Sequence, residues 1–375
     1  MFNGFEIDMV SLGDADCLIV TEWNPQWGMG RILIDGGSRS DAKVVKSFLL
    51  ERGYKYFYSV VCTHAHNDHA AGLIELVKDP AFTFSNGWMH DIRNHVDSAS
   101  LRKASAGNSS QADGVRQIVE TTKELDSAFR SRGVIPQEPF LGAAISGYPQ
   151  LVVLGPSLAF YKSVLADFTK VEVPSYLPPL LAAAVPAAGS TLPSSLPPFL
   201  RSALLQPAAK FPLSAPVPLA GLLGGSSVKD SPTTQPFNDT SVILGGIFQG
   251  HRVLLTADAG SKALDRVSPD WKSLSWMQVP HHGSDGNLSQ TNIERFHPQN
   301  AYISACGDSS HPNRAIVSGL VKAGAKVFST HQSGNLCFHI GSVPYRPNYS
   351  PAIPLKGTGN PQPFDWLSLI PGAKG

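Results

Sequence analysis

The sequence predicts a layered α/β protein in which two β-sheets pack face to face, with helices on their outer sides. Two observations predict this fold. Short apolar segments rich in Val, Ile and Phe alternate with segments of helical periodicity, and the alternation occurs in each half of the chain. The 375 residues, 42% of them hydrophobic, suffice for one large domain with its own core.

Elements in the N-terminal half are bounded by Gly, Asp and Ser residues, which favour turns and helix caps. Strands are expected at residues 5–10, 17–22, 31–34 and 57–62. The first helix is expected at 41–52, with Ser40 or Asp41 as its N-cap and Gly53 at its end. Further helices are expected at 70–78, 112–132 and 157–168.

The C-terminal half repeats this alternation, so it predicts the second sheet. Strands are expected at residues 241–248, 252–257, 274–279, 301–304, 326–329 and 336–340. Helices are expected at 261–267, 288–296 and 312–322.

A proline-rich segment separates the two halves. Residues 173–236 hold 13 of the 30 prolines and only four charged residues, so we interpret them as an insertion in a single domain of residues 1–341. We expect it to contain short helices or to pack on the body, although a flexible spacer is the alternative. A protein partner could dock on it. Residues 342–375 are expected to form an extended C-terminal arm.

Composition excludes some classes of protein. Lys and Arg number 30 and Asp and Glu 29, a net charge of +1, which excludes binding of a polyanion by bulk charge. Four widely spaced cysteines give neither a disulfide scaffold nor a thiolate zinc site. The first ten residues lack the pattern of a secretory leader, and prolines interrupt the longest uncharged stretch. We therefore expect a cytoplasmic protein without a membrane span.

The segment that follows the strand at 57–62 carries the most specific pattern in the chain. It contains His64, His66, Asp68 and His69. In extended backbone, residues i and i+2 point the same way, so His64 and His66 can present two imidazoles to one cation. Asp68 and His69 lie at the turn into the next helix and face a second position nearby. The alternative is a solvated histidine-rich loop.

Further candidate ligands follow strands of the second half. Asp258 can bridge two cations about 3.5 to 4 Å apart, as in hydrolytic two-metal sites, or else cap the helix at 261–267. The adjacent His281 and His282 are either ligands or structural, and His311 is either a site residue or part of a surface loop.

Imidazole and carboxylate donors without a thiolate suit Zn²⁺ and also Mn²⁺ or Fe. Coordination to such an ion lowers the pKa of a bound water to about 7, and the resulting hydroxide is the nucleophile of many hydrolases.

Together these residues resemble the HxHxDH signature of the metallo-β-lactamase superfamily, which residues 64–69 match at every specified position. Within it the chain looks most like the soluble domain of DNA-uptake channel proteins of the ComEC type. The motifs that carry this likeness, in the family's order, are residues 12–19 (LGDADCLI), 32–37 (ILIDGG), 238–241 (NDTS), 254–258 (LLTAD), 279–284 (VPHHGS) and 310–312 (SHP).

The resemblance implies a four-layer αββα sandwich with two divalent metal ions at one edge, zinc in preference to manganese or iron. It implies that His64 and His66 bind one ion, that Asp68 and His69 bind the other, and that Asp258 bridges them. His282 or His281 would complete the shell. Around these ligands, Asp35 would orient a metal-bound histidine, Asp16 would line the site, and Ser284 would lie beside it.

The chain departs from the family at three points, of which the mildest is Ala257 in place of the usual glycine before Asp258. Many superfamily enzymes have a metal-binding histidine shortly before the bridging aspartate, and Asn238 stands in that region here. We expect Asn238 either to bind the ion weakly or to leave the first position open. The chain also lacks channel-forming segments, so DNA uptake does not follow from the likeness.

These features favour a metal-dependent hydrolase that acts on a phosphodiester in a nucleotide or nucleic acid through a metal-bound hydroxide. Asp68 would be a catalytic group as well as a ligand, and His311 or His281 would protonate the leaving oxygen. A lactone, thioester or β-lactam hydrolase of the same fold is the alternative. A second alternative is a non-catalytic metal-containing protein that binds a partner through residues 173–236.

Overall fold

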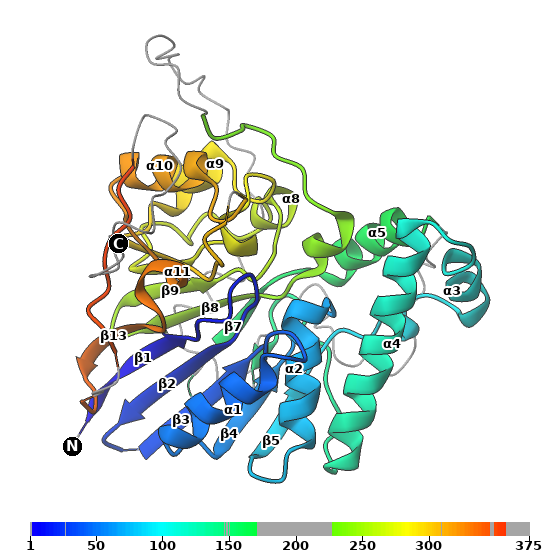
Figure 1. Ribbon diagram of the computed structural model, residues 1–375, viewed down its shortest axis with the longest axis horizontal. Coiled ribbons are helices and arrows are strands. Elements are labelled where there is room, and N and C mark those ends of the chain that lie inside the picture. Colours follow the sequence, from blue (N-terminus) through cyan, green and yellow to red (C-terminus); the bar gives the residue numbers. More distant parts are fainter. Residues whose placement is uncertain are drawn as a thin grey trace, which may run out of the picture.

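The computed structural model describes residues 2–26, 28–145, 147, 149, 151–170, 227–308, 310–345 and 349–357. In this part of the chain, two β-sheets pack against each other and helices cover their outer faces (Figure 1). The predicted four-layer αββα arrangement is confirmed. Most of the expected insertion, residues 173–226, lies outside the described residues.

The first sheet has six strands in the order β13-β1-β2-β3-β4-β5. β13, β1, β2 and β3 are antiparallel neighbours, whereas β3, β4 and β5 run parallel. The strands are β1 (Asn3–Met9), β2 (Leu18–Asn24), β3 (Gly28–Ile34), β4 (Tyr56–Val61), β5 (Thr83–Trp88) and β13 (Leu336–Ser342).

The second sheet has seven strands in the order β12-β11-β10-β9-β8-β7-β6. Here β9 to β12 run parallel, and β6 to β9 are antiparallel neighbours. The strands are β6 (Ala144–Ile145), β7 (Leu151–Gly155), β8 (Ile243–Phe248), β9 (His251–Leu255), β10 (Trp276–Gln278), β11 (Asn300–Ile303) and β12 (Lys326–Ser329).

Helices link the parallel strands and cover the sheets. The α-helices are α1 (Ala42–Glu51), α2 (Asn67–Lys78), α3 (Ser98–Ala104), α4 (Ser110–Ser131), α5 (Leu158–Thr169), α8 (Ser261–Leu264), α9 (Gln290–Phe296), α10 (Arg314–Lys322) and α11 (Thr330–Ser333). Three short 3₁₀ segments are η1 (Ile92–Asn94), η2 (Pro236–Thr240) and η3 (His281–Gly283). No helix of the described residues is long and apolar enough to cross a membrane.

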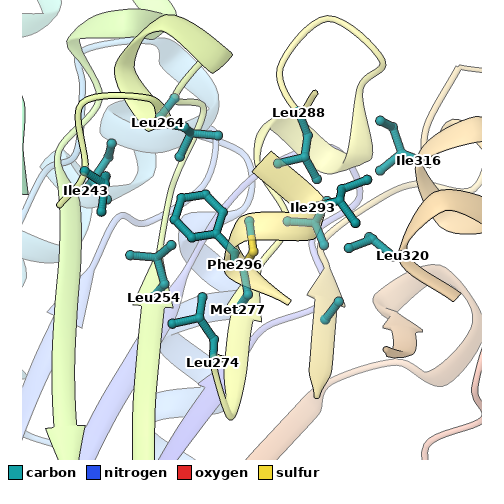
Figure 2. Close-up of a cluster of buried hydrophobic side chains, with 14 of the residues drawn as sticks. Ile243, Leu254, Leu264, Leu274, Met277, Leu288, Ile293, Phe296, Ile316 and Leu320 are labelled. Carbon is teal, nitrogen blue, oxygen red and sulfur yellow. The ribbon is translucent and has the colours of Figure 1, made fainter. Parts of the chain in front are cut away.

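Three apolar layers hold the sandwich together, because successive residues of a strand point to opposite faces. In β1, Phe5, Ile7 and Met9 enter the core between the sheets. Side chains of the other face of the first sheet pack against α1, α2 and α4. On the far side, β8 to β11 pack against α8, α9 and α10, with Phe296 and Met277 in the middle of this layer (Figure 2).

Most expected elements are present, but the strands β5, β6 and β7 and the short helices α3 and α11 were not predicted. β5, with the sequence TFSNGW, has no apolar run, and it is a strand because it pairs in parallel with β4. β7 is a short, fully buried apolar run, a pattern that does not separate strand from buried helix. α3 was also missed; it is a short helix capped by the Asp97 side chain. α2 starts earlier than expected, so Asp68 and His69 belong to its first turn.

The C-terminal segment packs on the body where it is described. The backbone N–H of Leu355 donates to the carbonyl of Val327 on β12 at 2.7 Å, and the Leu355 side chain is buried. The Tyr349 hydroxyl donates to Asp8 on β1. Residues 349–357 therefore lie along the outer edge of the second sheet and reach the first.

Two glycines fix the start of α2 against the end of β3. The N–H of Gly36 donates to the carbonyl of His69, and the N–H of Gly72 donates to the carbonyl of Gly37, at 2.9 and 2.8 Å. A Cβ on Gly72 would lie 2.0 Å from the Gly36 carbonyl oxygen. The helix that carries Asp68 and His69 can approach this closely only because both positions lack a side chain.

We predict that Gly72→Ala lowers the free energy of unfolding by about 1–3 kcal/mol, because the added methyl group forces α2 away from the β3 loop. Urea denaturation measures the change. Gly114→Ala in α4 is the matched control: its Cβ would meet only the Phe168 ring at 3.8 Å. Alanine at that helical position should raise stability by about 0.5–1 kcal/mol. Equal effects of the two substitutions would contradict the proposed close contact.

Candidate metal centre

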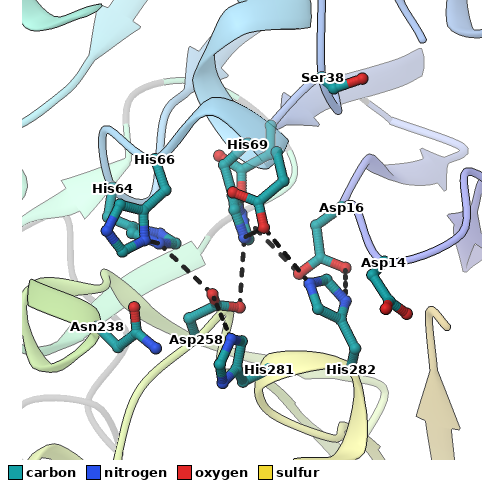
Figure 3. Close-up of polar contacts among 12 residues, drawn as sticks. Asp14, Asp16, Ser38, His64, His66, His69, Asn238, Asp258, His281 and His282 are labelled. Carbon is teal, nitrogen blue, oxygen red and sulfur yellow. Dashed lines mark hydrogen bonds and ion pairs between the residues drawn. The ribbon is translucent and has the colours of Figure 1, made fainter. Parts of the chain in front are cut away.

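The candidate site lies where the parallel strands of both sheets end. His64 and His66 follow β4, Asp68 and His69 belong to the first turn of α2, and Asp258 follows β9. His281 and His282 form η3 after β10. Because the carboxyl ends of parallel strands meet at one edge of a sheet, these distant segments converge (Figure 3).

One group of side chains consists of Asp68, His69, Asp258 and His282, each with a potential ligand atom within 4.8 Å of the others. His69 Nε2 lies 3.3 Å from Asp258 Oδ1 and 4.0 Å from Asp68 Oδ2. His282 Nε2 lies 3.7 Å from Asp68 Oδ2. Two imidazoles and two carboxylates therefore face one point.

A second group consists of His64, His66 and Asp258. His64 Nε2 lies 2.9 Å from His66 Nδ1 and 3.6 Å from Asp258 Oδ2. Asp258 belongs to both groups and presents a different oxygen to each: Oδ1 faces His69, and Oδ2 faces His64. This arrangement suits a carboxylate that bridges two cations.

Several polar atoms of the site are buried without a hydrogen-bond partner among the described residues. They are both carboxylate oxygens of Asp258, Nε2 of His69 and of His282, and Oδ1 of Asn238. Buried polar groups without partners are rare and costly in folded proteins. Donor atoms of this kind, spaced a few ångströms apart, fit divalent cations with bonds of about 2.0 to 2.2 Å to nitrogen and oxygen.

Outer hydrogen bonds turn two imidazoles toward the centre. His69 Nδ1 lies 2.8 Å from Asp35 Oδ2, and Asp35 also accepts from the backbone N–H and the hydroxyl of Thr63. His282 Nδ1 lies 3.0 Å from the Ser304 carbonyl oxygen, which can only accept. Each Nδ1 therefore carries the proton, and each Nε2 presents a lone pair to the centre.

Asp16 lies behind these two histidines and is fully enclosed. It accepts hydrogen bonds from Gln278 Nε2 at 2.8 Å and from the Ser304 hydroxyl. Its oxygens are 3.9 Å from His69 Nδ1 and 4.0 Å from His282 Nδ1. Burial raises the pKa of Asp16, although the neighbouring His282 and His69 oppose that rise.

The potential is negative around His69 and His282, whereas burial and neighbouring imidazoles lower the pKa of His64 and of His66. Burial disfavours a charged His69, yet Asp258, Asp35 and Asp68 around it raise its pKa well above the usual value. The pKa of His282 likewise rises to about 9 against the effect of burial, because Asp68 and Asp16 lie beside it. A field that favours protons on imidazoles also favours divalent cations in their place.

Four of the eight non-glycine residues with positive φ in the described part of the chain lie in the loops that deliver these residues. Asp35, Ala257, His281 and His282 all have positive φ angles, of 57°, 46°, 49° and 55°. Residues other than glycine occupy this region rarely, at a cost of about 1–3 kcal/mol each, and such strain clusters at functional sites.

Of the other expected residues, Asn238 is buried in η2 and its Nδ2 donates to Thr234 Oγ1 at 2.9 Å. Ser284 closes the turn after η3: its N–H donates to the His281 carbonyl, and its hydroxyl accepts from the N–H of Gly286. Asn238 thus lies in η2, just before β8, and Ser284 lies directly after η3.

His311 lies at the rim, outside both groups, with its ring centroid 5.7 Å from that of His281 and 5.9 Å from that of His282. Its Nδ1 contacts Asp14 Oδ2 at 3.0 Å. Asp14 also accepts from the N–H of Cys306. Burial opposes ionisation of Asp14, but these hydrogen bonds lower its pKa to about 2. Sequence reasoning missed Asp14, although it lies two residues before Asp16 in a quoted motif.

His90 and His95, the two other histidines of the N-terminal half, lie outside the centre. His90 is buried between the rings of Phe140 and Tyr161, at centroid distances of 4.6 and 4.5 Å. His95 Nε2 pairs with Glu138 at 2.8 Å. Burial, together with the neighbouring His95, lowers the pKa of His90 from 6.5 to about 3.

We predict that His90 makes the fold sensitive to acid. Below pH 6.5 the unfolded chain binds a proton at His90 and the folded chain does not until about pH 3, so stability falls as the pH is lowered through this window. His90→Gln should reduce the loss by about 1.4 kcal/mol per pH unit. Urea denaturation from pH 7 to pH 4 with a chelator present measures it, with the exposed His297→Gln as control. The prediction is wrong if the free energy of unfolding falls equally steeply with pH in His90→Gln and in wild type.

We further predict that Asp35→Asn weakens metal binding by about 10–100-fold. An uncharged amide oxygen is a weaker acceptor for the Nδ1 proton of His69 than the Asp35 carboxylate, so the ring is held less firmly. Competition with a chromogenic chelator measures the affinity for Zn²⁺. Asp113→Asn, which removes an exposed carboxylate of α4, should leave the affinity unchanged. An unaltered affinity in Asp35→Asn would exclude a role for Asp35 in orienting the ligand.

The two sheets with helices on their outer faces, and the position of the HxHxDH segment directly after β4, agree with the four-layer sandwich that the motif resemblance implied. A search of family models finds no match. Among curated proteins, ComE operon protein 3 of Bacillus subtilis (strain 168) is 26% identical over 129 residues, which is 32% of this chain. The matched stretch spans only 16% of that protein's length.

Several solved structures are similar at low identity. A diphosphatase from the PhnP family has 11% identity and a TM-score of 0.37, with 91% of this chain and 100% of that chain covered. A long form RNase Z from yeast has 9% identity and a TM-score of 0.36, with 81% and 38% covered. The metallo-β-lactamase SMB-1 has 12% identity and a TM-score of 0.30, with 80% and 81% covered. At these scores the matches do not bear on activity.

Proposed function

We propose that the protein is a metal-dependent hydrolase with two divalent cations, and that its substrate is a phosphodiester in a nucleotide or nucleic acid. One observation carries the hydrolase assignment. Two groups of ligand atoms, most of them buried, share Asp258, whose two oxygens face different groups and have no hydrogen-bond partner among the described residues. Paired cations about 3.5 to 4 Å apart are characteristic of hydrolytic centres.

The ligand sets follow from the two groups. His64 and His66 would hold the first ion, Asp68, His69 and His282 would hold the second, and Asp258 would contribute a carboxylate oxygen to each. Nitrogen and oxygen donors suit Zn²⁺, with Mn²⁺ or Fe as alternatives. When bound, the cations supply an activated water and polarise the electrophile.

The chain's own residues have separate tasks. Asp35 and the Ser304 carbonyl hold the Nδ1 protons of His69 and His282 and so fix both rings. Asp68 is both a ligand and a catalytic group: its side chain is 36% exposed, so water and substrate can reach a carboxylate that also faces His282.

His311 is the proton donor to the leaving oxygen in this proposal. Its Nδ1 is tied to Asp14, so Nε2 is the nitrogen that is left to donate. Its ring is partly exposed at the rim, beside the two histidines of η3. His281 is the other candidate donor from the sequence. Its Nε2 lies 3.7 Å from Asp258 Oδ2, so we assign it to the ligands of the centre and not to proton donation.

The choice of substrate depends on the motif resemblance to the ComEC type. Two cations in a buried centre stabilise charge that develops on a phosphoryl group and on a carbonyl group alike. Lactones, thioesters and β-lactams therefore remain the competing substrates of the same centre.

We predict that the metal-loaded protein hydrolyses bis(p-nitrophenyl) phosphate, and that Asp258→Ala lowers kcat/KM by about a thousand-fold or more, because both cations lose a ligand. Release of p-nitrophenolate measures the rate, with the exposed His339→Ala as control. Equal rates in wild type and Asp258→Ala would refute the mechanism.

The same preparation should be tested on lactone, thioester and β-lactam substrates. If one of these substrates is hydrolysed faster than the phosphodiester, the substrate assignment changes but the assignment as a hydrolase stands. No turnover of any substrate by protein that binds two ions would favour the non-catalytic metal-containing protein instead.

A further inference from the structure

We propose that His281 is a third imidazole ligand of the first cation, and that Asn287 holds it in the tautomer that binds metal. This assigns the two adjacent histidines of η3 to different ions. The inference rests on the two-cation centre of the proposed function, but metal content rather than turnover tests it.

The first position has fewer ligands than the second. Among the residues that the structure describes, His64, His66 and Asp258 form its group, whereas four side chains form the other. Asn238 offers a neutral amide oxygen, and its Nδ2 is engaged with Thr234. A cation bound by nitrogen and oxygen donors usually has at least four ligands, so the first position has room for one more strong donor.

His281 lies on the side of Asp258 that faces this position. Its Nε2 is 3.7 Å from Asp258 Oδ2, the same oxygen that lies 3.6 Å from His64 Nε2. His282 points to the other group and approaches Asp68 at 3.7 Å. Figure 3 shows the two adjacent rings diverging, with His281 below Asp258 and His282 beside Asp16.

Asn287 decides which nitrogen of His281 carries the proton. Its Nδ2 donates to the Asp258 carbonyl oxygen at 2.7 Å, so its Oδ1 is the atom that lies 2.9 Å from His281 Nδ1. An amide oxygen only accepts, and therefore Nδ1 of His281 must donate. Nε2 is then unprotonated in the neutral ring and presents a lone pair toward Asp258 Oδ2, as metal ligation requires.

The backbone supports the same arrangement. The N–H of His281 donates to the Ala257 carbonyl at 3.1 Å, which joins η3 to the loop that carries Asp258. Both histidines have positive φ, and this conformation directs two consecutive side chains to the site at a conformational cost. The His281 side chain is 27% exposed, so it has space to close on an ion.

Metal content per chain, measured by elemental analysis after dialysis, and Zn²⁺ affinity, measured by chelator competition, test the proposal. Wild type should hold two ions. His281→Ala should hold one ion firmly, with the affinity for the other lowered at least ten-fold. The exposed His339→Ala should match wild type. Two ions of unchanged affinity in His281→Ala, or a single ion in wild type, would overturn the assignment.

Double variants identify the ion that His281 binds. His64→Ala with His281→Ala should lose no more metal than His64→Ala alone, because both residues serve the same ion. His282→Ala with His281→Ala should lose both ions. The reverse pattern would place His281 on the second ion and overturn the proposal. Circular dichroism and thermal melting confirm that each variant is folded before its metal is counted.

Asn287 is a positioning residue, and two substitutions separate its role from simple packing. Asn287→Ala removes the acceptor for His281 Nδ1 and should lower the affinity for the first ion by about 10–100-fold. Asn287→Asp keeps an acceptor for His281 Nδ1 but loses the donor to the Asp258 carbonyl, so it should weaken binding of the first ion by a smaller factor than Asn287→Ala does. If Asn287→Asp loses as much metal as Asn287→Ala, Asn287 does not act through His281.

These results are independent of turnover. Protein that binds two ions through His281 but hydrolyses nothing would overturn the proposed function alone. Protein that hydrolyses a phosphodiester while His281→Ala keeps two tightly bound ions would overturn this assignment alone.

Discussion

The carboxylate of Asp258 is the group on which the rest of the site depends. It lies 1% exposed at the end of β9, with both oxygens turned to different sets of imidazoles and without a hydrogen-bond partner among the described residues. An ionised carboxylate in a protein interior requires compensating positive charge. Nearby His69 and His64 hold its pKa well below the usual value despite burial, and divalent cations would provide that compensation permanently.

The fold brings the ligands to this carboxylate by ending parallel strands of both sheets at one edge. Strands are regular, so the strain needed to aim individual side chains is confined to the short loops after them, where Asp35, Ala257, His281 and His282 have positive φ. The packed layers on either side keep these loops in place. Stability of the sandwich and geometry of the site are therefore linked through the same strand ends.

Sequence patterns predicted the four layers and most of the elements, because apolar periodicity reports directly which residues face a core. The HxHxDH spacing also placed His64, His66, Asp68 and His69 together, since these contacts are local. Asp14, Gln278 and Asn287 were not predicted. Asp14 meets His311 across 297 residues of sequence, and Gln278 meets Asp16 across 262. Asn287, only six residues beyond His281, was missed because its role depends on a loop conformation that no short pattern encodes.

The segment around Leu355 occupies the side of β12 that no other strand covers in the described part of the chain. An open strand edge presents unpaired N–H and carbonyl groups that can recruit a strand from another molecule. The Leu355 N–H occupies the Val327 carbonyl, one of the groups that such sheet extension would use, so the arm fills part of the edge at which another strand would pair.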